Sequence, residues 1–388
     1  MKIVIYTIDC YRGRENLMPW RTILEVALVM VENGHDACIL NACNREKDVV
    51  DYVWHSSLSS CYKGVKVYSI LKRDTDIQTK CVDLCPEVLF IPFSFRDGLR
   101  PARWIAQISC TKIGYMAGGV YDLKSGLLLK SMGGLIAAKP YLMEAVTPKL
   151  LFTRTLKKIG VKHVIALTDV SAKVVRSGGF ANVTIIYPGK DQFESLSSDD
   201  SIVRKYNLKG KKWLLFSGAP APTRGAEMLI RAVDMAQDDS IRLVMLMRTD
   251  VGSTYESFEK ALDRMKHPER VQIIREKVDR TQLRAFFGSA WYALLPFIVI
   301  PSEIPLTYFE LLSCGTPVIT FRNGGTTEYL KEGLLIADKS VKGLAQALDR
   351  AWSDEPLRRK LSENGKRIMV NHPTWSQVGS EWIKLLKK

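Results

Sequence analysis

The 388-residue sequence predicts an α/β fold of two successive domains, each built on a parallel β-sheet. Apolar runs of strand length, rich in β-branched residues, alternate along the chain with segments whose apolar residues recur at helical spacing. Strands joined through helices pair in parallel by right-handed crossovers. A polar stretch at residues 191–200 divides this alternation into two parts of similar size, which suits the usual size of a domain.

The first half alternates from its first residues. Residues 2–7 form a predicted strand, and residues 22–33 a predicted helix that closes at Asn33-Gly34, a usual helix stop. The strand at 35–40 completes a strand–helix–strand unit. Further strands are expected where the sequence is almost continuously apolar, as in buried parallel strands, at 65–70, 88–92, 112–115 and 164–168.

The second half repeats this order after the linker. Strands are expected at 212–217, 241–247, 271–274, 291–295 and 317–321. Helices are expected between and after them, at 225–236, 257–265, 280–288, 344–352 and 357–370. A last helix at 374–387 has apolar residues on one face, at Trp375, Val378, Trp382 and Leu385.

The composition is that of a globular protein without membrane spans, disulfides or a metal site. The apolar fraction of 46% suffices for ordinary cores, and no run reaches the ~18–20 apolar residues of a membrane span. The N-terminus lacks the apolar segment of a signal peptide, so a cytoplasmic protein is expected. The eight cysteines are expected to be free thiols, because the spacing of Cys81 and Cys85 suits neither a redox motif nor a zinc site. No metal site is expected.

Positive charge is concentrated in the first half. The chain has a formal net charge of +15, and residues 1–190 hold 26 Lys and Arg against 16 Asp and Glu. Residues 191–388 hold 30 against 25. This asymmetry predicts a polyanion or an anionic membrane surface as a partner, with a solvated basic surface as the alternative. Nucleic acid is not expected, since no recognised binding module appears.

Two segments of the first half contain several basic residues close together. Residues 93–104 interleave Phe and Trp with Arg96, Arg100 and Arg103. This pattern suits anionic headgroups or a phosphorylated lipid acceptor, or else a helix whose aromatic side lies in the core. A second basic cluster is most simply a solvated helix face and consists of Arg154, Lys157, Lys158 and Lys162.

Residues 303–320 carry the most informative local pattern: a turn, a short helix, a Gly-Thr-Pro break and a buried strand. Pro305 presets the start of the helix and cannot donate a hydrogen bond, so the N–H groups of Leu306 and Thr307 are the expected phosphate donors. Glu310 lies further into the helix, where its carboxylate can accept hydrogen bonds from ribose hydroxyls. The pattern therefore predicts a nucleotide-sugar site.

With these elements in order, the chain resembles the GT-B glycosyltransferases, and among them the retaining family 4 group. The resemblance covers nearly the whole chain and is strongest from residue 164 onward. It is carried by the Gly34-His35 step, Thr168-Asp169, the Pro-Gly turn at 186–191, the loop from Phe216-Ser217-Gly218 to Thr223-Arg224-Gly225, and residues 310–319. It implies a GT-B fold with two Rossmann-like α/β/α domains that face each other across a cleft. Residues 1–190, joined by the C-terminal helix 374–388, would be the acceptor side, and residues 191–373 the nucleotide-sugar donor side.

The resemblance also implies roles for single residues. Arg224 stands where the family usually has a lysine that faces the donor diphosphate. A guanidinium can bind a diphosphate bidentately, through two parallel hydrogen bonds. Glu310 matches the glutamate that binds ribose. Six residues separate Glu303 from Glu310, whereas seven separate the two glutamates in the family, so the family's spacing would place the first glutamate at Ser302. Pro305 stands where the family has glycines.

Other positions depart from the family pattern. Ala219 stands where an arginine is common, the glycine-rich loop after the first strand is reduced to Gly13 between Arg12 and Arg14, and residues 114–122 contain no histidine. The simple alternatives are a surface role for Arg224 and an exposed helical position for Glu310. Arg224 and Glu303 are the catalytic candidates, and the expected donor-binding set is Gly13, Ser217, Gly218, Arg224, Ser302, Glu303, Leu306, Thr307 and Glu310.

The function implied by the resemblance is that of a retaining hexosyltransferase that needs no metal and no cofactor. It would move a sugar from a nucleoside diphosphate sugar to a hydroxyl of a glycan, a lipid-linked or another anionic acceptor. A non-catalytic scaffold or binding subunit of the same fold is one alternative, and a sugar-nucleotide epimerase is another. A peripheral position at the inner face of the membrane is a second candidate location.

Overall fold

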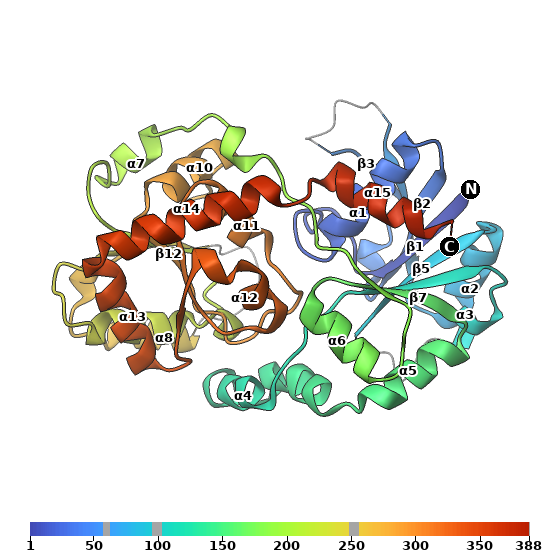
Figure 1. Cartoon of the computed structure of the whole chain (residues 1–388), viewed down its shortest axis with the longest axis horizontal. Helices are drawn as coiled ribbons and strands as arrows, with labels where there is room; N and C mark the ends of the chain where they lie inside the picture. Colours follow the sequence, from blue (N-terminus) through green and yellow to red (C-terminus); the bar gives the residue numbers. More distant parts are fainter. Residues whose placement is uncertain (57–62, 95–102, 248–255, 388) are drawn as a thin grey trace.

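The computed structural model describes residues 1–56, 63–94, 103–247 and 256–387 and has two α/β lobes (Figure 1). In this described part of the chain, the first sheet has eight strands in the order β3-β4-β2-β1-β5-β6-β7-β8. The second has six strands in the order β11-β10-β9-β12-β13-β14. The predicted α/β class with two parallel-sheet domains is confirmed. The boundary at residue 190 stays a prediction.

The first sheet is centred on β1 (Lys2–Ile8), which pairs in parallel with β2 (Asp36–Cys43) and β5 (Val88–Phe93). Its central strands are almost continuously buried, as their apolar sequence predicted. The short β3 (Tyr52–Trp54), which the sequence did not predict, is antiparallel to its neighbour. The remaining strands are β4 (Val65–Leu71), β6 (Thr111–Met116), β7 (Val161–Ala166) and β8 (Val183–Ile185).

Six helices among the described residues belong to this half: α1 (Trp20–Glu32), α2 (Asp74–Asp83), α3 (Arg103–Gln107), α4 (Leu123–Val146), α5 (Lys149–Lys158) and α6 (Asp169–Ser177). The long α4 bends at Gly134, whose φ of 77° is non-helical. Trp104 in α3 is buried against Tyr6, with ring centroids 5.1 Å apart. At Trp104, the aromatic side chain therefore lies in the core, which was one of the two alternatives for residues 93–104. Arg96 and Arg100 lie outside the described residues.

The second sheet is parallel throughout its described strands: β9 (Leu214–Gly218), β10 (Leu243–Met247), β11 (Val271–Ile274), β12 (Tyr292–Leu295), β13 (Val318–Phe321) and β14 (Leu334–Ala337). The helices that accompany these strands are α7 (Ser201–Lys205), α8 (Ala226–Met235), α9 (Glu256–Asp263), α10 (Arg280–Ser289), α11 (Leu306–Ser313), α12 (Gly324–Leu330), α13 (Val341–Ser353) and α14 (Glu355–Asn371).

The chain passes between the lobes twice, and the two crossing segments are bonded to each other. Lys190 N–H donates to the carbonyl of Pro373 at 3.0 Å. A side chain at Gly189 would overlap Trp375, so this close approach requires glycine. The last helix, α15 (Trp375–Leu385), then packs on α1 of the first lobe (Figure 1), with Trp382 against Phe90. Its predicted return to the first lobe is confirmed.

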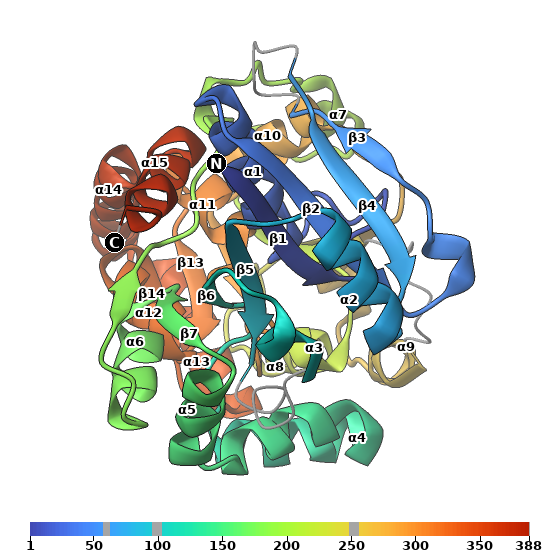
Figure 2. The ribbon, with the colours of Figure 1, turned by 90° about the vertical axis from the view of Figure 1, so that its right-hand side faces the viewer.

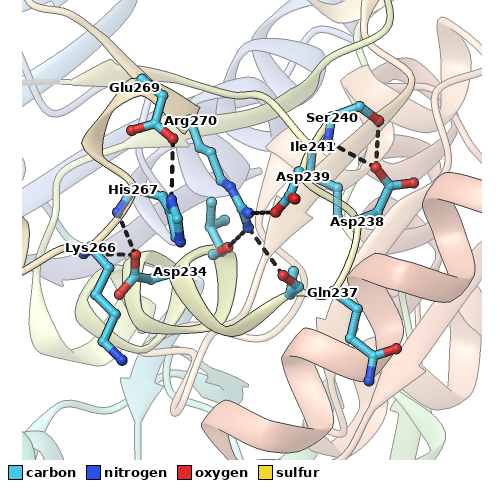
Figure 3. A network of polar contacts seen from close by, with 12 residues as sticks. Asp234, Gln237, Asp238, Asp239, Ser240, Ile241, Lys266, His267, Glu269 and Arg270 are labelled. Atoms are coloured by element: carbon cyan, nitrogen blue, oxygen red, sulfur yellow. Dashed lines mark hydrogen bonds and ion pairs between the residues drawn. The ribbon is translucent and has the colours of Figure 1, made fainter.

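A buried arginine closes the C-terminal end of α8 (Figure 3). Arg270 is 3% exposed, and its Nη1 donates to the carbonyls of Val233 at 3.1 Å and Ala236 at 3.0 Å. Its Nη2 pairs with the exposed carboxylate of Asp239. Because the last carbonyls of a helix lack partners within it, this network is a structural cap.

Candidate functional site

A narrow cleft between the two lobes is lined by residues of both. The first lobe contributes residues 119–122 and Ser125, and the second contributes 298–300, Glu303 and 323–326. Hydrogen bonds between the lobes cross the cleft. The Tyr121 hydroxyl donates to the Pro301 carbonyl at 2.6 Å, and Lys339 Nζ donates to Ser125 Oγ at 2.7 Å.

Glu303 reaches from the second lobe to the start of α6 in the first. Its carboxylate is 3% exposed, and both of its oxygens lie 3.1 Å from the hydroxyl of Thr168, the residue that caps α6. Burial raises the pKa of Glu303 from 4.5 to about 7, and hydrogen bonds from Ser171 and Thr168 oppose this rise. The Glu303 carboxyl therefore titrates near neutral pH at a contact between the lobes.

Ile304 shows how the chain accommodates the shortened spacing between Glu303 and Glu310. Its φ is 55°, a left-handed conformation that a β-branched residue rarely adopts and that costs on the order of 1–3 kcal/mol. A fully buried side chain and a hydrogen bond from its N–H to Thr326 Oγ1 at 3.2 Å hold it there. A turn that glycine would form easily is thus formed here by packing, and it leads into Pro305 and α11.

The first turn of α11 and Glu310 lie where the sequence predicted. Leu306 and Thr307 are half-buried in that turn, where backbone N–H groups have no carbonyl one turn earlier. The Glu310 side chain is 18% exposed, and its Oε1 lies 4.0 Å from Arg280 Nη2. Burial raises the pKa of Glu310 to about 7, while Arg280 lowers it. Arg280 also pairs with Asp191 in the first crossing segment, at 3.0 Å.

Ser217, Gly218 and Arg224 are brought together at the carboxyl end of β9. Gly218 has a φ of 142°, and a Cβ built there would overlap the Arg224 guanidinium, which therefore lies against the glycine. Gly225 has a φ of 66°, and a Cβ there would overlap the Pro296 carbonyl. These two glycines let Arg224 fold back toward the sheet edge, where its Cζ lies 5.3 Å from the centre of the Phe297 ring.

The other predicted site residues are less closely connected. Gly13 is exposed in the loop after β1, and its N–H already donates to the Glu15 carboxylate. Ser302 is half-buried in the loop before Glu303. The structure thus adds no observation for Gly13 as a phosphate contact, and its role in donor binding stays a prediction.

Several cleft residues were not predicted from the sequence. Asn323 follows β13 and Lys339 follows β14, so both lie at carboxyl ends of parallel strands, where ligands of such sheets bind. Burial lowers the pKa of Lys339, and Asp122 opposes this effect. Strand ends were the signal that could have found these two residues. In the described ranges, no group of three or more His, Cys, Asp or Glu side chains could hold a metal ion.

Residues 198–368 match the family model of the glycosyl transferases group 1. An uncharacterized glycosyltransferase of Methanocaldococcus jannaschii is 25% identical over 215 residues, which are 53% of this chain and 54% of the relative. A putative glycosyltransferase of Bacillus subtilis is 26% identical over 206 residues, or 50% and 49% of the two chains. The chain therefore spans about half the length of these curated relatives.

Solved structures resemble the whole chain. The sucrose-phosphate synthase of Thermosynechococcus elongatus superposes with a TM-score of 0.73 at 14% identity, over 99% of this chain and 98% of that chain. HepE of Anabaena, in complex with UDP and glucose, gives a TM-score of 0.69 at 14% identity over 100% of both chains. The fold is that of the GT-B glycosyltransferases. Within it, residues 198–368 are similar to the glycosyl transferases group 1.

Proposed function

We propose that the protein is a glycosyltransferase that takes its sugar from a nucleoside diphosphate donor bound to the second lobe. One observation carries the proposal. Arg224 lies at the carboxyl end of β9, and α11 begins beyond the carboxyl end of the neighbouring parallel strand β12, so a cation and a helix N-terminus share one edge of the sheet. This edge is where open parallel sheets bind nucleotides.

Each group has a distinct part in the proposed reaction. The Arg224 guanidinium and the N–H groups of Leu306 and Thr307 would stabilise the charge that develops on the departing diphosphate. Glu310 would accept hydrogen bonds from the ribose hydroxyls, displacing its contact with Arg280. Ser217 and Gly218 would line the diphosphate site, and Ser302 and Glu303 would lie nearest the sugar. The structure of HepE in complex with UDP and glucose supports a donor of this class.

The finer parts of the proposal concern stereochemistry and the acceptor. The reaction would retain the anomeric configuration without a metal, with the leaving phosphate assisting deprotonation of the acceptor hydroxyl. The cleft residues of the first lobe, among them Tyr121 and Ser125, would face a glycan or lipid-linked acceptor. Contacts that close the cleft, such as that between Lys339 and Ser125, would exclude water from the activated sugar.

Calorimetry with nucleosides, nucleoside monophosphates and diphosphates tests the donor site. Arg224→Ala should weaken diphosphate binding about tenfold or more and leave nucleoside binding unchanged, because it removes a charge-assisted contact to phosphate. Glu310→Ala should weaken both, because it removes the ribose contact. Arg231→Ala is the matched control, since this arginine is exposed on α8 and outside the cleft.

Turnover separates the proposal from its alternative. Release of diphosphate from a panel of sugar donors, followed by NMR of the product anomer with and without EDTA, reports donor, stereochemistry and metal need. If no nucleotide binds and both site variants behave as wild type, the donor site is refuted. Tight binding without turnover of any donor would favour a binding subunit, a role consistent with Ala219 in place of the second cation and with Glu303 bonded to Thr168.

A further inference from the structure

Exposed apolar side chains are concentrated on two consecutive helices of the first lobe. Of the fourteen exposed large apolar side chains among the described residues, eight lie between residues 123 and 151. We call the outer side of α4 and the first turn of α5 the α4–α5 surface. Its apolar members are Leu123, Leu127, Leu135, Ile136, Met143, Val146, Leu150 and Leu151.

The opposite face of α4 fixes this helix in place. Leu129 and Ala138 are fully buried in the core of the second lobe, and Gly133 lies against Pro222 so closely that a Cβ would overlap it. The outer face is therefore held in position. Ile136, Met143 and Val146 follow one another at intervals of seven and three residues, so they share one side of the helix.

The most exposed apolar side chain of this surface follows directly after the bend in α4. Gly134 interrupts the helix, and Ile136, two residues later, is 93% exposed. An isoleucine so fully exposed leaves nearly all of its apolar side chain in water. Figures 1 and 2 both show α4 and α5 together along the lower edge of the molecule, at its periphery.

The charge around these apolar residues is almost entirely positive. Residues 123–158 contain seven Lys and Arg and a single acidic residue, Glu144, whose side chain is buried. A second copy of this chain would bring six exposed cations against six in a symmetric contact, which opposes self-association. An anionic lipid surface matches both properties, because lysine and arginine bind lipid phosphates while apolar side chains enter the headgroup region. Six of these cations are exposed: Lys124, Lys130, Lys139, Arg154, Lys157 and Lys158. The seventh, Lys149, is half-buried and donates to the Glu144 carbonyl at 3.0 Å.

We propose that the α4–α5 surface docks on an anionic lipid bilayer, with Ile136, Met143 and Val146 entering the headgroup region. Among the residues that the structure describes, no helix is long and apolar enough to cross a membrane, so this contact is a surface one. α4 begins beside the cleft, where Ser125 is a lining residue, and docking therefore brings the cleft close to the bilayer. The proposal does not depend on the proposed transferase activity.

Co-sedimentation with vesicles tests the proposal on the full chain. Vesicles of phosphatidylcholine alone are compared with vesicles that contain about 30% phosphatidylglycerol, at low and high salt. The apolar variant is Ile136→Ser with Met143→Ser and Val146→Ser. Its control changes three exposed valines elsewhere: Val50→Ser, Val53→Ser and Val82→Ser.

The basic variant is Arg154→Gln with Lys157→Gln and Lys158→Gln, and it should lower the partition coefficient on the order of 100-fold, at about fivefold per cation. Its control removes three exposed arginines of the second lobe: Arg350→Gln, Arg359→Gln and Arg367→Gln. Since all substituted side chains are exposed, thermal unfolding should confirm that every variant folds.

The expected result is binding of the wild type to anionic vesicles alone, loss at high salt, loss in both surface variants and binding by both controls. Equal recovery with both lipids, or surface variants that bind as the wild type does, would overturn the proposal. Concentration-dependent dimerisation that the apolar variant abolishes, without binding to vesicles, would assign the surface to a second copy and overturn it equally.

Discussion

The buried carboxyl of Glu303 makes the stability of the protein depend on pH in a calculable way. Its pKa is about 7 in the folded protein, against the usual 4.5, because burial disfavours the charge. Between these two values the folded protein keeps the proton that the unfolded chain releases. The free energy of unfolding therefore falls as pH rises through this interval. At about 1.4 kcal/mol per pH unit, the loss amounts to about 3 kcal/mol.

Glu303→Gln isolates this contribution, because glutamine has nearly the same shape, can accept the Thr168 hydrogen bond and cannot ionise. Urea unfolding of both proteins at several pH values from 4.5 to 7.5 gives the difference in free energy of unfolding. Other titrating groups cancel in that difference. The variant should gain about 3 kcal/mol on the wild type between pH 4.5 and 7. Glu363→Gln, at an exposed glutamate, is the control and should stay within about 0.5 kcal/mol.

A difference that does not change with pH would show that the Glu303 carboxyl is solvated like an exposed one, and the argument from burial would fail. A difference of opposite sign would show that the hydrogen bonds from Thr168 and Ser171 outweigh burial and hold the group ionised. Either result would also show that the contact between Glu303 and Thr168 does not make the stability of the protein depend on pH near neutrality.

Three further changes test other parts of the structure by thermal and urea unfolding. Gly225→Ala should lower the free energy of unfolding at least about twice as much as Gly210→Ala. Both glycines have a positive φ, which costs an alanine about 1–2 kcal/mol, but only at Gly225 does a carbonyl occupy the place of the Cβ. Equal losses in the two variants would contradict that packing. Arg270→Ala should cost about 2 kcal/mol by leaving helix carbonyls without a donor, whereas the exposed Arg231→Ala should stay within about 0.5 kcal/mol. Burial lowers the pKa of His372 to about 4, so between pH 6.5 and about 4 only the unfolded chain takes up the proton, and the wild type loses about 3 kcal/mol of stability over this interval. His372→Gln should abolish this loss. An unchanged dependence of stability on pH would contradict the burial of His372 as a neutral ring.

The sequence predicted most buried strands to within a few residues, because a strand covered on both faces has to be apolar along its whole length. It did not predict α4, for a physical reason. Leu129 and Ala138 enter the core of the second lobe while Ile136 and Val146 are exposed, so apolar residues occur on both sides and no helical period stands out. Gly134 and Pro140 interrupt the pattern further. β3 was missed because three residues are too few to show alternation.

The candidate site was predictable where one local element supplies it. Glu310 and the first turn of α11 follow from Pro305 and the apolar flank of that helix, whereas Arg224 was singled out by the resemblance to the GT-B glycosyltransferases. The partners of these groups were not predictable. Thr168 lies 135 residues from Glu303 in sequence, and only the packing of the two lobes brings them together.

The two glutamates of this segment are attached to different parts of the protein, and this limits how a ligand can bind. Glu303 is bonded to Thr168 at the start of α6, and Glu310 faces Arg280, which also pairs with Asp191 in the crossing segment. A ligand hydroxyl that bonds to Glu303 has to compete with the Thr168 hydroxyl, and one that bonds to Glu310 has to compete with Arg280. Since the first of these contacts joins the lobes and the second reaches the segment between them, ligand binding at either glutamate changes the free energy that holds the lobes in this arrangement. The left-handed Ile304 and the first turns of α11 are the segment that connects these two contacts.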